Sequence, residues 1–380
     1  MATVLTPTVA TTETTQPALV WRTPEELREI AEREPTNPMP LYMLAHVLRR
    51  HGDPSWEAAA TAASQRSHAT PQRFYARAIT QILYGDWNGW SALDSRLHEP
   101  GTIRDLSPFG EVCWKRQRWD GQEDLRDKSL LILPEQGHGD CLQMWRFMPP
   151  LLEVVGQPIL TVYSRLVPLA RHVFGSRCKL VLYDIKTSIP ADRYVWALSL
   201  PGIFGALPPF TPLNPPRRRP RIPRPEGRLQ AGVCWAGEPG YQQDSERSMP
   251  ISELAPVFSR PEIDWHSLQV GTRAVDADRY PTLRKPDPPL INYADTADLM
   301  AQLDFVVTVD TSVAHLAGLL GVPTYLLLQL DSHWRWGLRD TTPWYPSIRL
   351  IRQSVLGDWT SAVRELSTLL DERPLLAEVA

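Results

Sequence analysis

The sequence predicts a mixed α/β protein in which a small all-α module precedes two doubly wound α/β domains. Three observations carry this prediction. Residues 24–100 place apolar side chains at helical spacing, the chain beyond Lys128 alternates short apolar runs with helical patterns, and a proline-dense stretch divides that α/β part in two. A chain of 380 residues has room for such a plan. The predicted parts are a disordered tail at 1–22, the helical module at 23–120, a first α/β domain at 121–205, a proline- and arginine-rich linker at 206–227 and a second α/β domain at 228–380.

The composition is that of an ordinary globular protein. The formal net charge is −3 and the isoelectric point is about 6.3, whereas bulk nucleic-acid binding requires a basic face, so we expect no nucleic-acid partner. The four cysteines form no C-x-x-C pair, which argues against a zinc site and a disulfide framework. The N-terminal stretch lacks the pattern of a signal peptide, and no apolar run is long enough to be a transmembrane segment. We therefore expect a cytoplasmic protein with reduced thiols.

The helical module is predicted to begin at Pro24, with Thr23 as the N-cap of its first helix. A Gly-Asp pair at Gly52 recurs 33 residues later at Gly85, close to the tetratricopeptide (TPR) period of about 34 residues. We interpret the module as TPR-like. Such a module offers a groove for a protein partner, and it serves equally well as a docking or stabilising domain.

The two α/β domains are predicted from short apolar runs that are separated by helical patterns, the signature of a parallel sheet. A last helix is expected at 360–370, where apolar side chains share one face. The predicted strands lie at 129–133, 158–163, 179–183 and 194–198 in the first domain, and at 230–235, 265–270, Phe305–Val309 and Thr324–Leu328 in the second.

The linker between the domains contains five arginines, which could contact an acidic partner. A stiff, solvated linker is the default interpretation of such a proline-rich segment. The arginines are Arg217, Arg218, Arg219, Arg221 and Arg224.

The first candidate site is the turn after the first predicted strand of the first α/β domain. Gly137 and Gly139 allow the backbone to turn sharply and to approach a ligand, and they flank His138. The pattern lacks the spacing of a dinucleotide fingerprint or a Walker loop. Asp140 stands where a helix begins, so it is either an N-cap or a general base that takes a proton from an attacking hydroxyl. Taken alone, the residue favours the cap.

The second candidate site follows the strand Phe305–Val309. Asp310 ends that strand, Thr311 and Ser312 open a helix, and Val313 and His315 lie in its first turn. The free N–H groups and the positive dipole end of a helix suit a phosphate group. This turn is therefore predicted to hold an anionic group, although a histidine in such a place more often packs against its neighbours than binds a ligand.

Two weaker signals lie in the second domain. Arg247 could clamp a phosphate in bidentate fashion or form a surface salt bridge. Residues 276–278 have the D-x-D form of a metal motif, but the pattern is common by chance, and we expect a loop there.

The motifs in this order resemble bacterial TPR proteins with a C-terminal glycosyltransferase domain, which are related to the ADP-heptose lipopolysaccharide heptosyltransferases and, more distantly, to O-linked N-acetylglucosamine transferases. The resembling segments span most of the chain from about residue 80 to 360. They are 83–90 (LYGDWNGW), 118–120 (RWD), 135–147 (EQGHGDCLQMWRF), 232–237 (GVCWAG), 247–250 (RSMP), 267–271 (SLQVG), 294–299 (ADTADL), 309–318 (VDTSVAHLAG), 333–336 (HWRW) and 343–347 (PWYPS).

The resemblance implies a GT-B fold of two Rossmann-like domains, without a catalytic metal or other cofactor. It implies a nucleotide-diphosphate sugar as donor, bound by the C-terminal domain, and a protein or glycan acceptor. By position, Asp140 resembles the acidic base of the heptosyltransferase-like enzymes. The resemblance also implies the contacts to the donor. The backbone of Thr311, Ser312 and Val313 would bind the diphosphate, and Asp310 would lie near the sugar hydroxyls. Gln269 and Arg247 would be further donor contacts.

Two positions depart from the family pattern. Val270 stands where the family often has lysine, so one positive charge near the diphosphate is missing unless Arg247 or Arg273 replaces it. His138 stands where an aliphatic residue is common, and beside Asp140 it either shares the proton transfer or is incidental. The leading hypothesis is an inverting glycosyltransferase. The alternatives are a non-catalytic TPR scaffold and a regulator that binds nucleotide without turnover.

Overall fold

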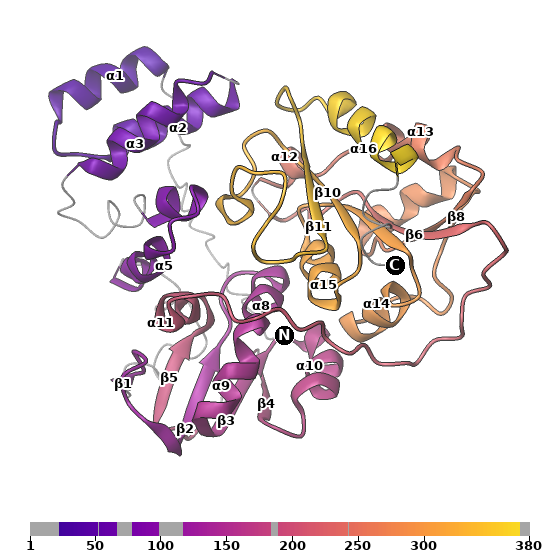
Figure 1. The fold of residues 1–380 in the computed structure, drawn as a ribbon, viewed down its shortest axis with the longest axis horizontal. Helices are drawn as coiled ribbons and strands as arrows, with labels where there is room; N and C mark the ends of the chain where they lie inside the picture. The colour runs from indigo at the N-terminus through magenta and orange to yellow at the C-terminus, as the bar shows by residue number, and fades with distance from the viewer. Residues whose placement is uncertain are drawn as a thin grey trace, which may run out of the picture.

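A computed structural model describes residues 23–51, 53–66, 78–98, 117–183, 189–241 and 243–372. The protein is a mixed α/β structure with two parallel sheets, and a group of helices lies beside them (Figure 1). The predicted disordered tail at 1–22 lies outside the described residues. Within the described part, no helix is long and apolar enough to cross a membrane.

The helical module is built on α1 (Pro24–Arg33), α2 (Met39–Arg50) and α3 (Trp56–Gln65), followed by α5 (Asn88–Ala92) and the 3-10 helix η1 (Leu93–His98). Its predicted start is confirmed, because Thr23 caps α1 in a capping box with Glu26 and Pro24 occupies the first turn. Leucine and alanine side chains of α1, α2 and α3 form a small core of their own. The TPR assignment stays a prediction, because Gly52 and residues 67–77 lie outside the described part.

The first sheet has the strand order β1-β5-β2-β3-β4, and all its strands are parallel. One face packs in the largest apolar cluster, which also contains side chains of α8, α9 and α10, whereas Leu97 of η1 contacts the other face. The strands are β1 (Gln117–Arg118), β2 (Leu125–Leu133), β3 (Val155–Val162), β4 (Lys179–Leu182) and β5 (Arg193–Trp196). The helices are α8 (His138–Met144), η2 (Trp145–Phe147), α9 (Met148–Val154), η3 (Ser164–Leu166), α10 (Val167–Phe174), η4 (Ala197–Ser199) and α11 (Leu200–Phe204).

The second sheet has the order β11-β10-β9-β6-β7-β8 and is also parallel. Alternate residues of its strands enter two clusters, one shared with α14 and α15 and the other with α13 and α16, as in a doubly wound sheet. The strands are β6 (Leu229–Cys234), β7 (Ile263–Ser267), β8 (Leu283–Arg284), β9 (Phe305–Val309), β10 (Thr324–Leu328) and β11 (Ile348–Arg352). The helices are α12 (Asp244–Arg247), η5 (Ile251–Leu254), α13 (Ala255–Phe258), η6 (Thr272–Arg279), α14 (Tyr293–Met300), α15 (Ser312–Leu320), η7 (Trp334–Trp336) and α16 (Thr360–Glu372).

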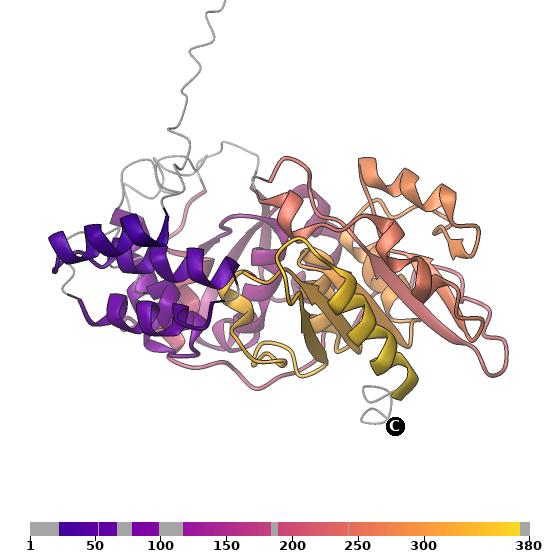
Figure 2. The same cartoon turned by 90° about the horizontal axis from the view of Figure 1, so that it is seen from above.

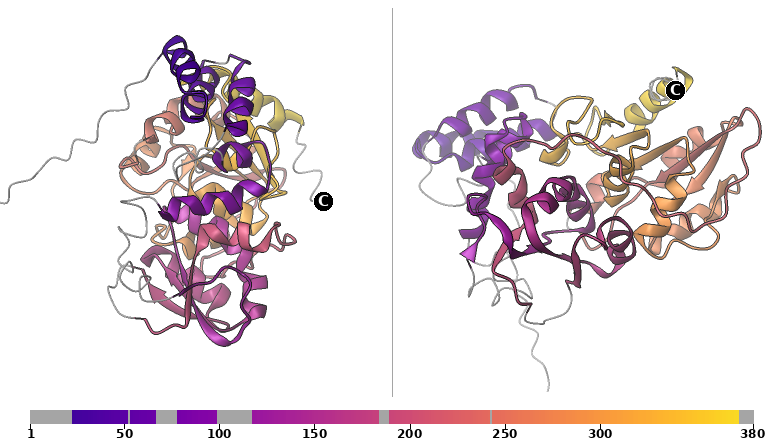
Figure 3. Two further views of the ribbon diagram at one scale, coloured as in Figure 1. Left: turned by 90° about the vertical axis from the view of Figure 1, so that its left-hand side faces the viewer. Right: turned by 60° about the horizontal axis from the view of Figure 1, so that its bottom comes forward.

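The predicted linker runs along the outside of the molecule from α11 to β6 (Figures 1 and 3). Its backbone is fastened to the second domain, because the N–H groups of Arg218 and Arg219 both donate to the carboxylate of Asp298. Arg224 forms an ion pair of 2.8 Å with Asp304. The linker is thus fastened through its backbone, while the side chains of Arg218 and Arg224 are exposed, as expected for a solvated linker. The acidic partner of Arg224 belongs to the same chain.

The helical module contacts the segment that follows β10, residues 329–346, which lies between the module and the second sheet (Figure 2). Arg49 of α2 forms an ion pair of 3.1 Å with Asp331, and both side chains are largely buried. The ring of Trp90 packs edge-on against Trp334 and Trp344, with centroids 5.5 and 5.3 Å away. The largest apolar cluster is consequently continuous through the module and both sheets.

Candidate functional site

Apart from the two-residue edge strand β1, the chain enters each sheet in its interior and extends it to both sides, so each sheet has a point where the strand order reverses. In such sheets, ligands bind outside the carboxyl ends of the strands at this point. The first interior strands are β2 and β6, and their neighbours across the reversal are β5 and β9. The chain leaves β2 at the turn that carries Asp140, and it leaves β9 at Asp310. Both predicted turns therefore stand at the positions that the topology favours.

The turn after β2 holds Asp140 in two interactions. Its Oδ2 accepts a hydrogen bond of 2.8 Å from the N–H of Gly137, the N-cap of α8. Its Oδ1 forms an ion pair of 2.7 Å with Nη1 of Arg335. Gln136 has a φ of 58°, a left-handed conformation that is uncommon for a residue with a side chain. Asp140 is therefore not the N-cap that the sequence taken alone favours, because Gly137 occupies that position. Asp140 is the third residue of α8, where its carboxylate accepts from the N-cap as in a capping box, and it also faces the second domain.

The turn after β9 leads into α15, whose first turn carries no acidic side chain. The hydroxyl of Thr311, the N-cap, accepts a hydrogen bond of 3.3 Å from the N–H of Val313, so one of the predicted backbone donors is occupied by the cap. The hydroxyl of Ser312 accepts one of 2.7 Å from Tyr293 of α14. The helix that follows is buried along its length and ends at Gly321.

Asp310 is a partly buried carboxylate beside this helix start. Burial raises its pKa, and a side-chain hydrogen bond from Trp336 acts in the opposite direction. Its backbone oxygen accepts a hydrogen bond of 3.2 Å from Arg247. The charge of Asp140 also raises the pKa of Asp310, which places the carboxylates of the two predicted turns within electrostatic reach of each other.

The two turns are in direct contact because Gly139 has no side chain. A Cβ at this position would lie 2.8 Å from Cδ2 of His315 and 3.3 Å from Cα of Ser312. No real Cβ approaches an aromatic carbon that closely, so only glycine lets the starts of α8 and α15 pack together. The structure therefore brings the residues around Asp140 and those at 310–315 to one place.

His315 is a neutral support at this contact. Burial lowers its pKa to about 3, and the charge of Arg335 adds to the shift. Its Nδ1 lies 3.0 Å from the hydroxyl of Tyr345, and its ring stacks on Trp336 at 4.9 Å. Since Trp336 in turn holds Asp310, His315 orients its neighbours.

His138, the other predicted catalytic residue, lies in an aromatic group. Its ring is 5.0 Å from that of Tyr163 and 5.4 Å from that of Tyr293, which comes from the second domain. The structure thus places His138 at the domain contact, and its predicted share in proton transfer stays a prediction.

Gln269 is buried, and its amide is engaged with the backbone. Its Oε1 accepts hydrogen bonds from the N–H groups of Trp235 and Ala236 at 3.2 and 3.0 Å, and its Nε2 donates to the carbonyl of Ala236 at 3.0 Å. These bonds tie the end of β7 to the end of β6. Gln269 shapes the neighbourhood of the turn, and its predicted contact with the donor stays a prediction. Val270, the next residue, is 41% exposed.

Arg247 and Arg273 share one buried partner. Nε of Arg247 lies 3.2 Å from Oδ1 of Asp244, and Nη2 of Arg273 lies 2.9 Å from Oδ2. The Arg247 guanidinium also stacks over Tyr241 at 4.4 Å. A Cβ on Gly237 would lie 2.4 Å from Nη2 of Arg247, so this glycine makes room for the guanidinium at the end of β6. Arg247 is thus a part of the site, and its salt bridge is buried rather than superficial.

Arg335 is the functional side chain that the sequence analysis did not single out. It belongs to η7, and only 7% of its surface is exposed. Besides its ion pair with Asp140, its Nη2 donates to Oε1 of Gln136 at 2.8 Å. Its guanidinium stacks on Trp334 at 4.4 Å. The motif HWRW was available as a signal, but no local pattern shows that its arginine reaches a turn almost two hundred residues earlier.

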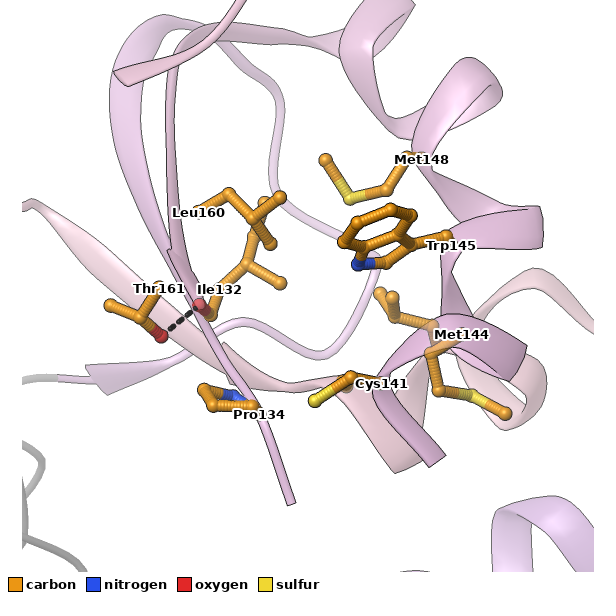
Figure 4. Close-up of a pocket in the computed structure, with 10 residues that line it drawn as sticks. Ile132, Pro134, Cys141, Met144, Trp145, Met148, Leu160 and Thr161 are labelled. Carbon is orange, nitrogen blue, oxygen red and sulfur yellow. Dashed lines mark hydrogen bonds between the residues drawn. The ribbon is translucent and has the colours of Figure 1, made fainter. Parts of the chain in front are cut away.

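Two other features lie apart from this site. Residues 276–278 form part of the 3-10 helix η6 rather than the expected loop, and Asp278 pairs with Lys285. Within the described residues, no group of three histidine, cysteine or acidic side chains is placed to hold a metal ion. A small pocket lies behind α8, where Cys141 and Trp145 face Leu160 (Figure 4). Its lining is almost wholly apolar, so it belongs to the core of the first domain.

Comparisons with known proteins give distant likenesses. No family model matches the chain. Protein FlbA from Caulobacter vibrioides is 25% identical over 350 residues, which are 81% of this chain and 57% of that protein, so the chain spans little more than half of this curated relative.

Solved structures resemble the chain at low similarity. Escherichia coli ADP-heptose lipopolysaccharide heptosyltransferase II is 15% identical with a TM-score of 0.45, over 66% of this chain and 100% of the other. Escherichia coli heptosyltransferase WaaC with ADP is 12% identical with a TM-score of 0.40, over 64% and 99%. A family 9 glycosyl transferase from Veillonella parvula is 10% identical with a TM-score of 0.42, over 68% and 99%. At these identities and TM-scores, the likenesses establish neither a family nor an activity.

Proposed function

We propose that the protein is a metal-independent, inverting glycosyltransferase of GT-B architecture, which moves a sugar from a nucleotide-diphosphate sugar to a hydroxyl of a protein or glycan acceptor. One observation carries the proposal. A carboxylate turn and a capped helix start, each at the reversal point of its own parallel sheet, meet where Gly139 packs against Ser312 and His315. Two of the motifs that resemble glycosyltransferases, 135–147 and 309–318, lie at this meeting point. The helices before the sheets are proposed to be a TPR-like module that binds a protein partner.

The donor side of the proposed reaction is the start of α15. As the bond between sugar and diphosphate breaks, negative charge develops on the leaving oxygen. A helix N-terminus stabilises such charge, and Arg247, which lies beside Asp310, adds a cation. These groups supply the electrostatic stabilisation for which many transferases use a metal ion.

The acceptor side is Asp140. A general base must lie within hydrogen-bond reach of the hydroxyl that it deprotonates. Asp140 lies at the start of α8, across the contact from the proposed diphosphate site, so it would activate an acceptor that attacks from the face opposite the leaving group. Such an in-line attack inverts the anomeric carbon. The proposed place of action is the cytoplasm, as expected from the sequence.

The test is a panel of sugar nucleotides screened by thermal shift, followed by an assay of donor hydrolysis. We expect one donor class to raise the unfolding temperature and to be hydrolysed slowly. Asp140→Ala should abolish hydrolysis and retain binding, because this carboxylate is proposed to act on the acceptor or water. Thr311→Pro should abolish binding, since it removes the side-chain cap of α15. Donor binding that survives Thr311→Pro would contradict the proposed phosphate site.

One observation favours a second candidate, a non-catalytic scaffold or nucleotide-binding regulator with a degenerate transferase domain. Val270 is an exposed apolar side chain at a position where the resemblance implies a lysine. This candidate predicts either no stabilisation by any sugar nucleotide or stabilisation without turnover. The same panel therefore separates it from the enzyme.

A further inference from the structure

The charges around the proposed diphosphate site are balanced before any ligand arrives. Arg247 and Arg273 are the cations nearest to Asp244, a buried carboxylate that contacts both. Asp310 adds a second carboxylate. The formal charges of these four side chains cancel, and Val270 contributes none. The site thus needs a further cation if it is to hold a group with two or more negative charges.

Arg335 has the properties of that cation. Its Nε is buried and has no hydrogen-bond partner among the described residues. One of its five N–H donors is therefore unused in an environment where an unsatisfied donor costs about 1–3 kcal/mol. Burial raises the pKa of Asp310, and the charge of Arg335 is among the influences that lower it. Arg335 is consequently close to the turn after β9 as well as to Asp140.

The ion pair with Asp140 conflicts with the proposed role of that carboxylate. Oδ1 is held by Arg335 and Oδ2 by the N–H of Gly137. Each oxygen already accepts one of the two hydrogen bonds that it can form, so in the empty protein part of the carboxylate's capacity is occupied before an acceptor hydroxyl arrives. The forked N–H groups of a guanidinium match the oxygens of a phosphate as well as those of a carboxylate. A phosphate group can therefore replace Asp140 as the partner of Arg335.

We propose that Arg335 is the cation that receives the leaving diphosphate and that Asp140 holds it until the donor binds. This inference rests on the proposed function. Donor binding transfers Arg335 from the carboxylate to the phosphates, and the transfer frees Oδ1 of Asp140. The acceptor hydroxyl then gives its proton to Asp140, its oxygen forms the bond to the anomeric carbon, and the bond to the phosphate oxygen breaks with its electron pair remaining on the diphosphate. The base thus becomes available only when a donor is present.

The experiment measures the affinities of ADP, GDP, UDP and inorganic pyrophosphate by calorimetry, with the matching nucleosides as reference. Arg335→Gln should weaken diphosphate binding about tenfold to a hundredfold and leave nucleoside binding unchanged. Asp140→Asn should tighten diphosphate binding about fivefold or more, because Arg335 no longer has to leave a carboxylate. In the Arg335→Gln background, Asp140→Asn should have no effect. Arg260→Gln is the matched control, since Arg260 pairs with Asp371 away from both turns.

The outcomes separate the two proposals. If the wild-type protein binds none of the diphosphates, the proposed function fails. If it binds one of them and Asp140→Asn leaves the affinity unchanged or weaker, the exchange is refuted. Tighter diphosphate binding by Asp140→Asn that persists in the Arg335→Gln background also refutes the exchange. That result would arise from the lost repulsion between the Asp140 carboxylate and the diphosphate. If Arg335→Gln does not fold, Arg335→Lys takes its place, and the gain from Asp140→Asn should shrink in that background because lysine lacks the forked geometry.

Discussion

At the reversal point of each sheet, a strand leads through a turn into a helix. The groups that occupy the two turns differ in charge and burial. In the first sheet, this point is filled by the protein itself. The buried carboxylate of Glu135 accepts two hydrogen bonds from Arg96 of η1, at 2.8 and 2.7 Å, and a third of 3.0 Å from the N–H of Leu198. In the second sheet, the turn after β9 carries the start of a nine-residue helix, and Arg247 lies beside it.

The difference shows that a strand-to-helix turn acquires its function from segments that are distant in sequence. Arg96 comes from the helical module, and it neutralises the Glu135 carboxylate that fills the first turn. Among the described residues, no carboxylate paired with an arginine occupies the helix start of the second turn. Under the proposed function, the first domain presents a carboxylate and the second receives an anion.

The largest effect on stability is expected from a substitution of Arg96, which fills the first reversal point. Arg96→Met should lower the free energy of unfolding by about 3–5 kcal/mol, because it leaves the buried Glu135 carboxylate without its partner. Urea denaturation measures the loss. The double variant Arg96→Met with Glu135→Leu should recover part of it, because the unpaired buried charge is gone but the N–H of Leu198 loses its acceptor.

The matched control is Arg126→Met, which removes an exposed arginine whose partner is the neighbouring Asp124. It should leave the urea midpoint unchanged. A loss of less than about 1 kcal/mol for Arg96→Met would contradict the prediction, because that result would mean that water reaches Glu135.

A smaller effect is expected where the two turns touch. Gly139→Ala should cost about 1–3 kcal/mol in stability and lower turnover about a hundredfold, because its Cβ would push the start of α8 away from the buried ring of His315. Thermal unfolding and donor hydrolysis are the measurements. Gly240→Ala is the control, since the nearest atom to its Cβ would be 4.0 Å away. Equal behaviour of the two variants would show that the contact is not tight in solution.

The smallest effect concerns pH and the second turn. Burial raises the pKa of Asp310 in the folded state above its ordinary value of 3.8. The wild-type protein therefore has the full stability of the neutral carboxyl group below pH 3.8 and loses it as the pH rises through the higher, folded-state pKa. Asp310→Asn avoids this loss. It should raise the unfolding temperature by about 1–2 °C at pH 7, and the gain should vanish near pH 3.5. A gain that is equal at both pH values would assign the effect to something other than ionisation.

Much of the fold could be predicted where the strands are fully buried. The predicted strands Phe305–Val309 and Thr324–Leu328 agree with β9 and β10 to the residue, because polar or turn-forming residues bound these apolar runs. Strand β11 was not predicted. Its sequence IRLIR carries arginines at the second and fifth positions, which interrupt the apolar run. The guanidinium of Arg352 is accommodated by a distant segment, because it donates to the carbonyl of Gly337 at 2.8 Å.

The site could be predicted in part, where its residues have local sequence signals. The turns at Asp140 and Asp310 have local signals in glycines and capping residues, and the structure places them in contact. The partner of Asp140 could not be predicted, because Arg335 belongs to a segment whose path depends on its contacts with the helical module. Likewise, nothing near Gln269 in the sequence indicates that its amide is engaged by the end of β6.

The helical module cannot be treated as a removable accessory. It supplies Arg96 to Glu135 in the first domain and Arg49 to Asp331 in the second. A truncated protein that starts at β1 would expose the apolar surface around Trp344 and would leave two acidic side chains without their cations. Inactivity of such a fragment would report misfolding rather than the loss of a recruited acceptor. Whether the helices recruit a partner is better asked with substitutions at exposed positions such as Glu29 and Glu32, which leave the scaffold intact.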